Sequence, residues 1–204
     1  MAYVKNKRVY GVGINDANYN VVKYDENRKN VWTCPYYNRW KSLLERVYSE
    51  VYHKKRPTYK GTTVCAEWLI FSNFKKWVDE QDVEDWEKLV IDKDLLSTNG
   101  KHYSPETCVF ISNALNVFLT DSASARGDYL IGVSRDSRLK NDRFRAQCSN
   151  PFGKTKAEGK YLGSYHTEEE AHLAWKRKKR EYTLQFIKEQ TDRRVIEKLE
   201  VMFV

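Results

Sequence analysis

The centre of the chain reads Cys65-Ala-Glu-Trp-Leu-Ile-Phe-Ser-Asn-Phe-Lys-Lys-Trp77, then Val90-Ile-Asp-Lys-Asp94, then Tyr103-Ser-Pro-Glu-Thr-Cys-Val-Phe-Ile-Ser-Asn-Ala-Leu-Asn116. Aromatic residues recur at helical spacing in the first stretch, which predicts a helix with a buried aromatic face. The second stretch predicts an acidic hairpin entered by a short strand at residues 88–91, and the third predicts a polar helix. Because titratable side chains gather in these stretches, we expect any chemistry to lie here.

Length and composition favour a packed protein with a polyanionic partner. The 204 residues are 41% hydrophobic and 14% aromatic, which is enough for a core. Lys and Arg number 36 against 28 Asp and Glu, so the net charge is +8. This excess points to a nucleic-acid partner, although an ordinary basic surface explains it nearly as well.

Several classes of protein are disfavoured by the sequence. No stretch approaches the ~20 apolar residues of a membrane span, so we expect a cytoplasmic protein without a membrane partner. The four cysteines are far apart and form no Cys-x-x-Cys pair. This spacing indicates reduced, mostly buried thiols, not a zinc knuckle or a disulfide framework.

An amphipathic helix is predicted before the central segment, because apolar residues recur at helical spacing from Pro35 to Val51. The basic segment at residues 53–60 follows and is expected to be a loop. Its Lys54, Lys55 and Arg56 are candidates to lie along a DNA phosphate backbone, while a plain solvated loop is the competing interpretation.

The predicted fold class is α+β, with two domains joined by a linker. Residues 1–119 form the first domain, the small polar residues 120–128 form the linker, and residues 129–204 form the second domain. Three short strands are expected at 130–134, 143–148 and 160–165, followed by a helix that opens with a capping box at Thr167-Glu-Glu-Glu170. The tail from Thr191 has helical apolar spacing and is expected to form a further helix or a homodimer contact.

Alternation along the second strand separates polar from apolar side chains. Arg143, Arg145 and Gln147 project together, opposite Phe144 and Ala146. With a helix on the apolar side, the arginine side stays open to enter a major groove. The candidate DNA-binding residues of this module are Arg135, Arg138, Arg143, Arg145, Gln147, Lys154, Lys156 and Lys160.

Four ordered motifs in this module resemble the APETALA/ethylene-response-factor DNA-binding domain. They are Ile131-Gly-Val-Ser134, Arg143-Phe-Arg-Ala-Gln147, Tyr161-Leu-Gly-Ser-Tyr165 and Thr167-Glu-Glu-Glu-Ala-His-Leu-Ala-Trp175. The resemblance implies a three-stranded antiparallel sheet backed by one helix, with Arg135, Arg143, Arg145 and Lys160 in the major groove.

The central segment is similar to bacteriophage homing endonucleases of the HNH, or ββα-metal, class, which often carry such a reader at the C-terminus. The motifs that carry this resemblance are Val64-Cys-Ala-Glu-Trp68, Ile91-Asp-Lys-Asp94 and Tyr103-Ser-Pro-Glu-Thr-Cys108. The resemblance implies a Mg²⁺ or Mn²⁺ site with Asp92 and Asn116 as ligands, and a location in the cytoplasm of the infected bacterial host. Asp94 lies two residues after Asp92 and could face the same metal, although an acidic turn explains the two aspartates almost as well.

Two positions depart from the nuclease pattern. Lys93 stands where the family has its catalytic histidine, and Thr107 stands where it has an orienting asparagine. A lysine with an ordinary pKa near ~10.4 is protonated at neutral pH and cannot take a proton from water. Lys93 would need a lowered pKa or a purely electrostatic role. His102, expected on a nearby loop, is a candidate substitute base, while an exposed polar residue is the favoured interpretation.

Three hypotheses for function follow. The first is a double-stranded-DNA-binding protein of the homing-endonuclease type that nicks or cleaves DNA with a divalent metal. The second is a sequence-specific DNA-binding regulator that has lost catalysis and needs no cofactor. The third is a phage factor that binds a host protein through its aromatic surface.

Overall fold

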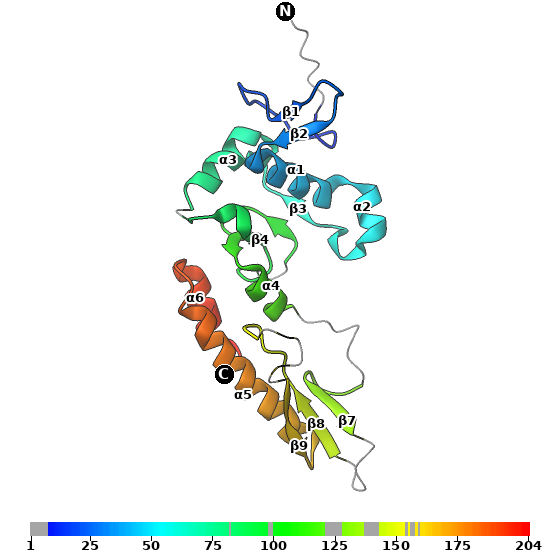
Figure 1. The fold of residues 1–204 in the computed structure, drawn as a ribbon, viewed down its shortest axis with the longest axis vertical. Coiled ribbons are helices and arrows are strands. Elements are labelled where there is room, and N and C mark those ends of the chain that lie inside the picture. The colour runs from blue at the N-terminus through cyan, green and yellow to red at the C-terminus, as the bar shows by residue number, and fades with distance from the viewer. Residues whose placement is uncertain are drawn as a thin grey trace, which may run out of the picture. The chain divides into compact units, whose positions relative to one another are not determined.

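A computed structural model describes residues 8–81, 83–97, 100–120, 128–136, 143–153, 155, 158 and 160–204 (Figure 1). Within these ranges helices alternate with small sheets, which confirms the mixed α and β content. The chain forms two compact units, Met1–Phe110 and Ile111–Val204. The division falls before the last helix of the expected first domain, and residues 121–127 of the expected linker lie outside the described ranges.

The core of the first unit is built by α1 (Pro35–Tyr48) and α3 (Phe71–Asp79). Trp40, Leu43, Leu44 and Val47 form the buried face of α1, as the helical spacing predicts. The indole of Trp40 donates a hydrogen bond of 2.6 Å to the carbonyl of Trp68. This bond joins α1 to the 3-10 turn η2 (Glu67–Leu69), which precedes α3.

The first predicted helix is divided into two. Ser49 ends α1, and its hydroxyl accepts the N–H of Tyr52 to cap α2 (Glu50–Lys55). The apolar spacing continues across this break, so periodicity alone merged the two helices. The expected basic loop is therefore wrong at its start, because Lys54 and Lys55 lie in the last turn of α2. A 3-10 turn, η1 (Pro57–Tyr59), follows.

Short strands complete the first unit. They form the pairs β1 (Val22–Tyr24) with β2 (Asn30–Thr33), β3 (Thr63–Val64) with β5 (His102–Tyr103), and β4 (Val90–Asp92) with β6 (Val109–Ile111). A 3-10 turn, η3 (Trp86–Lys88), leads into β4. The acidic hairpin is wrong as predicted, because β4 and β5, consecutive in the chain, pair with different partners.

The third central stretch is also corrected. Only α4 (Asn113–Leu119) is helical there, since Val109, Phe110 and Ile111 form a fully buried strand. Their β-branched and aromatic side chains favour a strand.

The second unit contains the predicted three-stranded antiparallel sheet and its helix. The strands are β7 (Val133–Asp136), β8 (Arg143–Gln147) and β9 (Tyr161–Tyr165), in the order β7-β8-β9. The helix α5 (Glu168–Ile187) opens with the predicted capping box of Thr167 and Glu170. Ala146, Ala171 and Ala174 form the buried contact between the sheet and α5, where small side chains permit close packing.

The far half of α5 packs against the other two helices of this unit. Phe118 of α4 lies 5.1 Å from Phe186, ring centre to ring centre. The tail forms α6 (Arg193–Glu200), which confirms the helix interpretation, and its Val195 and Leu199 are buried within the chain. A homodimer contact stays a prediction. No helix among the described residues is long and apolar enough to cross a membrane.

Candidate functional site

The pairing register gives the three-stranded sheet two chemically different faces. Val133 pairs with Ala146, and Phe144 pairs with Tyr165, on the face that α5 covers. Ser134 pairs with Arg145, which in turn pairs with Ser164, on the opposite face. The face without α5 therefore carries arginine and hydroxyl side chains.

Arg145 is the most constrained cation on this open face. Its guanidinium carbon lies 4.9 Å from the ring centre of Tyr161, a cation–π contact across to β9. The Tyr161 hydroxyl is 3.0 Å from the Ser164 hydroxyl. The Nε of Arg145 is buried and has no hydrogen-bond partner among the described residues. Arg145 is thus oriented by an aromatic ring while a donor remains unsatisfied.

The other predicted DNA contacts divide into three groups. Arg143 and Gln147 alternate with Ala146 and share the side of Arg145. Arg135 pairs with Phe144 and so belongs to the face that α5 covers, where it is exposed, and its DNA contact stays a prediction. Lys160 is exposed just before β9. Arg138, Lys154 and Lys156 lie outside the described residues.

The predicted phosphate contacts of the first unit are exposed at one end of α2. Lys54 and Lys55 occupy its last turn, and Arg56 follows directly. Basic side chains at a helix C-terminus are stabilised by the helix dipole. All three remain accessible to a polyanion.

Asp92 caps the turn that follows β4. Its Oδ1 accepts the backbone N–H of Asp94 at 3.0 Å and that of Leu95 at 2.7 Å. Asp92 is only 8% exposed. Burial raises the pKa of its carboxyl above the ordinary value and the charge of Asp94 adds to the rise, although the two N–H donors and Lys93 oppose it.

Lys93 is enclosed by partners from the same unit. Its ammonium donates to Asp94 Oδ1 at 2.6 Å and to the carbonyl of Gly100 at 2.5 Å. The rings of Tyr59 and Tyr103 lie 5.7 Å and 5.6 Å from the ammonium nitrogen. The side chain is 10% exposed. Lys93 therefore acts as a structural cation that closes the turn.

The remaining nuclease-type positions are engaged in hydrogen bonds or lie in the other unit. His102 lies on β5, not on a loop, and its Nδ1 is 2.8 Å from the Thr63 hydroxyl. Thr107 donates 2.7 Å to the carbonyl of His102. Asn116 is half-buried on α4, in the second unit, whereas Asp92 belongs to the first.

These contacts do not fit a divalent-cation site at the end of β4. One oxygen of Asp92 already accepts two N–H bonds, and the Asp94 carboxylate is paired with a buried ammonium that would repel a metal. Among the described residues, no group of three or more His, Cys, Asp or Glu side chains is arranged to hold a metal ion.

Burial disfavours the reactive thiolate form of Cys65 and Cys108. All four are free, and Cys34, Cys108 and Cys148 are buried as predicted. Burial raises the pKa of Cys65 to about 11 and that of Cys108 to about 12. The protonated thiol is a poor nucleophile.

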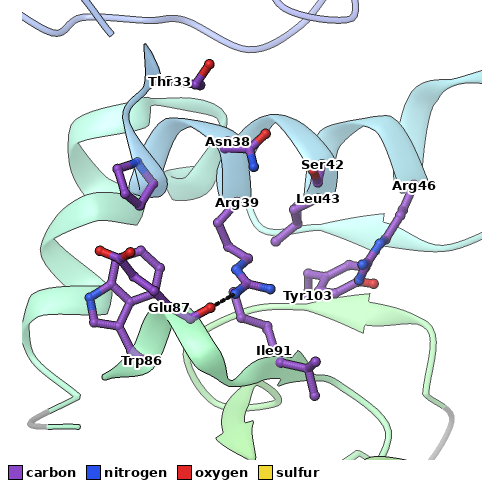
Figure 2. A pocket seen from close by; sticks show the side chains of 12 residues that line it. Thr33, Asn38, Arg39, Ser42, Leu43, Arg46, Trp86, Glu87, Ile91 and Tyr103 are labelled. Atoms are coloured by element: carbon purple, nitrogen blue, oxygen red, sulfur yellow. Dashed lines mark hydrogen bonds between the residues drawn. The ribbon is translucent and has the colours of Figure 1, made fainter. Parts of the chain in front are cut away.

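A pocket that the sequence analysis missed lies between α1 and the η3–β4 segment (Figure 2). Arg39 and Arg46 reach into it from α1, and Trp86 and Ile91 face them. The signal in the sequence is the spacing of Arg39, Ser42 and Arg46, three and four residues apart along one helix face. Such a stripe is ordinarily taken for a solvated surface.

Comparison of the chain with protein-family models, with curated proteins and with solved structures finds no match to any of them. The functional argument therefore rests on the geometry of these sites.

Proposed function

We propose that this protein binds double-stranded DNA in a sequence-specific manner through the open face of β7–β9, and that it does so without cleaving the DNA. One observation carries the proposal. The register places Arg145 on the face opposite Ala146 and α5, with its guanidinium held over Tyr161.

The chemistry of this face suits the major groove of B-DNA. Arginine can bond the O6 and N7 of guanine with two donors, and glutamine can bond adenine in the same way. Arg143, Arg145 and Gln147 alternate along β8, so their side chains reach one groove together. The Tyr161 ring already restricts the Arg145 side chain, so Arg145 loses less conformational entropy when it binds DNA.

The net charge of +8 and the exposed Lys54, Lys55 and Arg56 support a second, sequence-independent contribution. Cations along a phosphate backbone raise affinity by releasing counterions. Their loss weakens binding on every sequence alike, whereas the loss of a base contact also alters sequence preference.

Binding without cleavage is favoured by the contacts of Lys93. The residue at the position of the family's catalytic base donates to Asp94 and Gly100 and is almost buried. A protonated ammonium so placed has no lone pair for a proton from water. The segment departs from the strand–strand–helix order of the resemblance, because β5 lies between β4 and β6 in the chain and pairs with β3.

The proposal is tested by selecting duplexes from a random library with the whole protein and then measuring affinities by fluorescence anisotropy. We expect one preferred site, binding that is unchanged by EDTA, and a linear fall of log K with log salt concentration. Arg145→Ala should weaken binding to the preferred site by roughly tenfold and reduce its advantage over a random duplex.

Three matched variants sharpen this test. Arg145→Lys keeps the charge and should lose sequence preference more than affinity for random DNA. Lys54→Ala should weaken both duplexes by the same factor. Arg177→Ala removes an exposed guanidinium from α5 and should change neither preference nor affinity strongly. Equal losses on both duplexes for Arg145→Ala would contradict base reading by the sheet.

A further inference from the structure

The pocket beneath α1 has the size and lining of a small-molecule site. Its volume is about 400 Å³, within the range of roughly 300–1,000 Å³ that is common for ligand pockets. All of its lining residues belong to the first unit. Polar groups of α1 form one wall, and apolar and aromatic side chains of η3 and β4 form another (Figure 2).

The helical repeat brings two arginines to the same wall. Arg39 and Arg46 are seven residues apart on α1, which is nearly two turns at about 3.6 residues per turn. Figure 2 shows both side chains reaching from α1 toward Tyr103 and Ile91, with Leu43 between their points of origin. Ser42 lies on the same stretch of helix and also lines the cavity.

The contacts of Arg39 leave its positive charge uncompensated. Its Nη2 donates to two neutral backbone carbonyls, those of Glu87 at 3.1 Å and Leu89 at 2.8 Å. No carboxylate lies within ion-pair distance of Arg39 in the part of the chain that the structure describes. Burial and then the charge of Arg46 lower the pKa of Arg39, and these effects outweigh the opposing charge of the exposed Glu87.

Arg46 is likewise surrounded by neutral partners. Its guanidinium carbon lies 5.8 Å from the ring centre of Tyr59, and Figure 2 shows its guanidinium next to the Tyr103 hydroxyl. Burial raises the pKa of that hydroxyl well above its ordinary value, so Tyr103 is neutral at physiological pH. Burying the Arg39 charge against neutral carbonyls and beside the like charge of Arg46 costs free energy, which a bound anion would offset.

We propose that this cavity binds a small phosphorylated molecule, with Arg39 and Arg46 holding its phosphoryl group and Trp86 and Ile91 contacting an apolar or aromatic part. Guanidinium groups match phosphate in charge and in paired-donor geometry. Nucleotides have this combination of anion and flat apolar ring. The site is separate from the sheet of the second unit, so the proposal stands or fails independently of DNA reading.

The test titrates the whole protein with inorganic phosphate, adenosine monophosphate, adenosine triphosphate and uncharged adenosine by isothermal titration calorimetry. We expect the nucleotides to bind more tightly than phosphate alone, and adenosine to bind at least tenfold more weakly than its monophosphate, because one lost hydrogen bond to a charged group is about a tenfold change or more. No binding of any phosphorylated compound would overturn the proposal.

Two substitutions check that binding occurs in this cavity. Asn38→Asp adds a carboxylate at the cavity edge near the start of α1, where the helix dipole favours it, so the variant should fold. It should weaken nucleotide binding by roughly tenfold. Lys41→Gln makes the same change in net charge on an exposed site of α1 outside the cavity and should leave binding unchanged. Equal weakening by both would overturn the assignment.

A competition experiment separates the two sources of a phosphoryl group. A short duplex should not displace adenosine monophosphate from the Arg145→Ala variant, in which binding through the sheet is impaired. If the duplex fully displaces adenosine monophosphate, and if Asn38→Asp abolishes this displacement by the duplex, the cavity binds the nucleic-acid backbone. That outcome would overturn the proposal of a small-molecule ligand.

Discussion

Lys93 and Arg145 are two cations beside tyrosine rings, and they differ in how their hydrogen-bond donors are satisfied. Lys93 directly follows β4, and Arg145 lies within β8. Lys93 donates to a carboxylate and a carbonyl and is nearly buried, whereas Arg145 keeps a buried Nε without a partner among the described residues. A cation whose donors are satisfied by its own fold stabilises that fold. Arg145 lies on the sheet face without α5, and under the proposal its guanidinium donors other than Nε meet the DNA.

The largest expected effect in the comparison of Lys93 with Arg145 is at Asp92, which hydrogen-bonds the same turn as Lys93 does. Asp92→Ala removes the acceptor of two backbone N–H groups in a buried turn. We expect the free energy of unfolding to fall by about 3 kcal/mol, since each unsatisfied buried group costs about 1–3 kcal/mol. Urea unfolding followed by tryptophan fluorescence measures this loss.

Asp92→Asn serves as the control, because the amide oxygen still accepts both bonds. The raised pKa of Asp92 means that burial favours its protonated form, so the stability linked to that proton is present at low pH and lost as pH rises through the folded-state pKa. Asp92→Asn should therefore gain stability relative to the wild type as pH rises from about 3 to about 7. A constant difference across that range would contradict the effect of burial.

The local features of the fold were predictable, and the features that depend on distant partners were not. Alternation along β8 and the Thr167 capping box depend on neighbouring residues and were confirmed. The strand position of His102 depends on its pairing with Thr63, far away in sequence, and was missed. The break at Ser49 had a local signal, a serine cap, which the uninterrupted apolar spacing hid.

The candidate sites follow the same division. The face on which Arg145 lies was predictable, because strand alternation fixes it. The cavity of Arg39 and Arg46 was not predicted from the sequence. Its opposite wall comes from η3 and β4, which lie far from α1 in the chain and meet α1 only through tertiary packing. The resemblance placed Lys93 in a catalytic motif, while the partners that satisfy Lys93 became visible only in three dimensions.

Lys93→Ala tests the structural role directly. The variant loses two charge-assisted hydrogen bonds and two aromatic contacts. We expect a fall of about 2 kcal/mol in the free energy of unfolding, within the range for bonds to charged groups. DNA affinity, measured below the unfolding transition, should stay within about twofold of the wild type. This corresponds to a change of at most ~0.4 kcal/mol in the binding free energy.

The same comparison predicts that supercoiled plasmid stays closed when incubated with the wild type in Mg²⁺ or Mn²⁺, while a gel shift reports binding. Agarose electrophoresis distinguishes nicked from closed plasmid. Metal-dependent nicking that Asp92→Asn lacks would contradict the structural role of Lys93 and restore the nuclease hypothesis.

Arg135 and Arg145 provide a matched pair within one sheet, because they lie on opposite faces of adjacent strands. Arg145→Ala should weaken binding to the preferred duplex by roughly tenfold, and Arg135→Ala by less than about threefold, since a phosphate contact at the edge carries less than a base contact. Fluorescence anisotropy at fixed salt measures both. Equal effects would show that both faces contact DNA, or that neither reads bases.

Tyr161 sharpens the comparison by the smallest expected change. Tyr161→Leu removes the ring under the Arg145 guanidinium, which is 4.9 Å away, and an exposed cation–π contact is worth about 0.5–1 kcal/mol. Affinity for the preferred duplex should therefore fall by roughly threefold. Tyr161→Phe keeps the ring and loses only the hydroxyl near Ser164, so it should bind as the wild type does. If both variants lose affinity equally, the hydroxyl and not the ring positions Arg145, and the parallel with the tyrosines around Lys93 no longer holds.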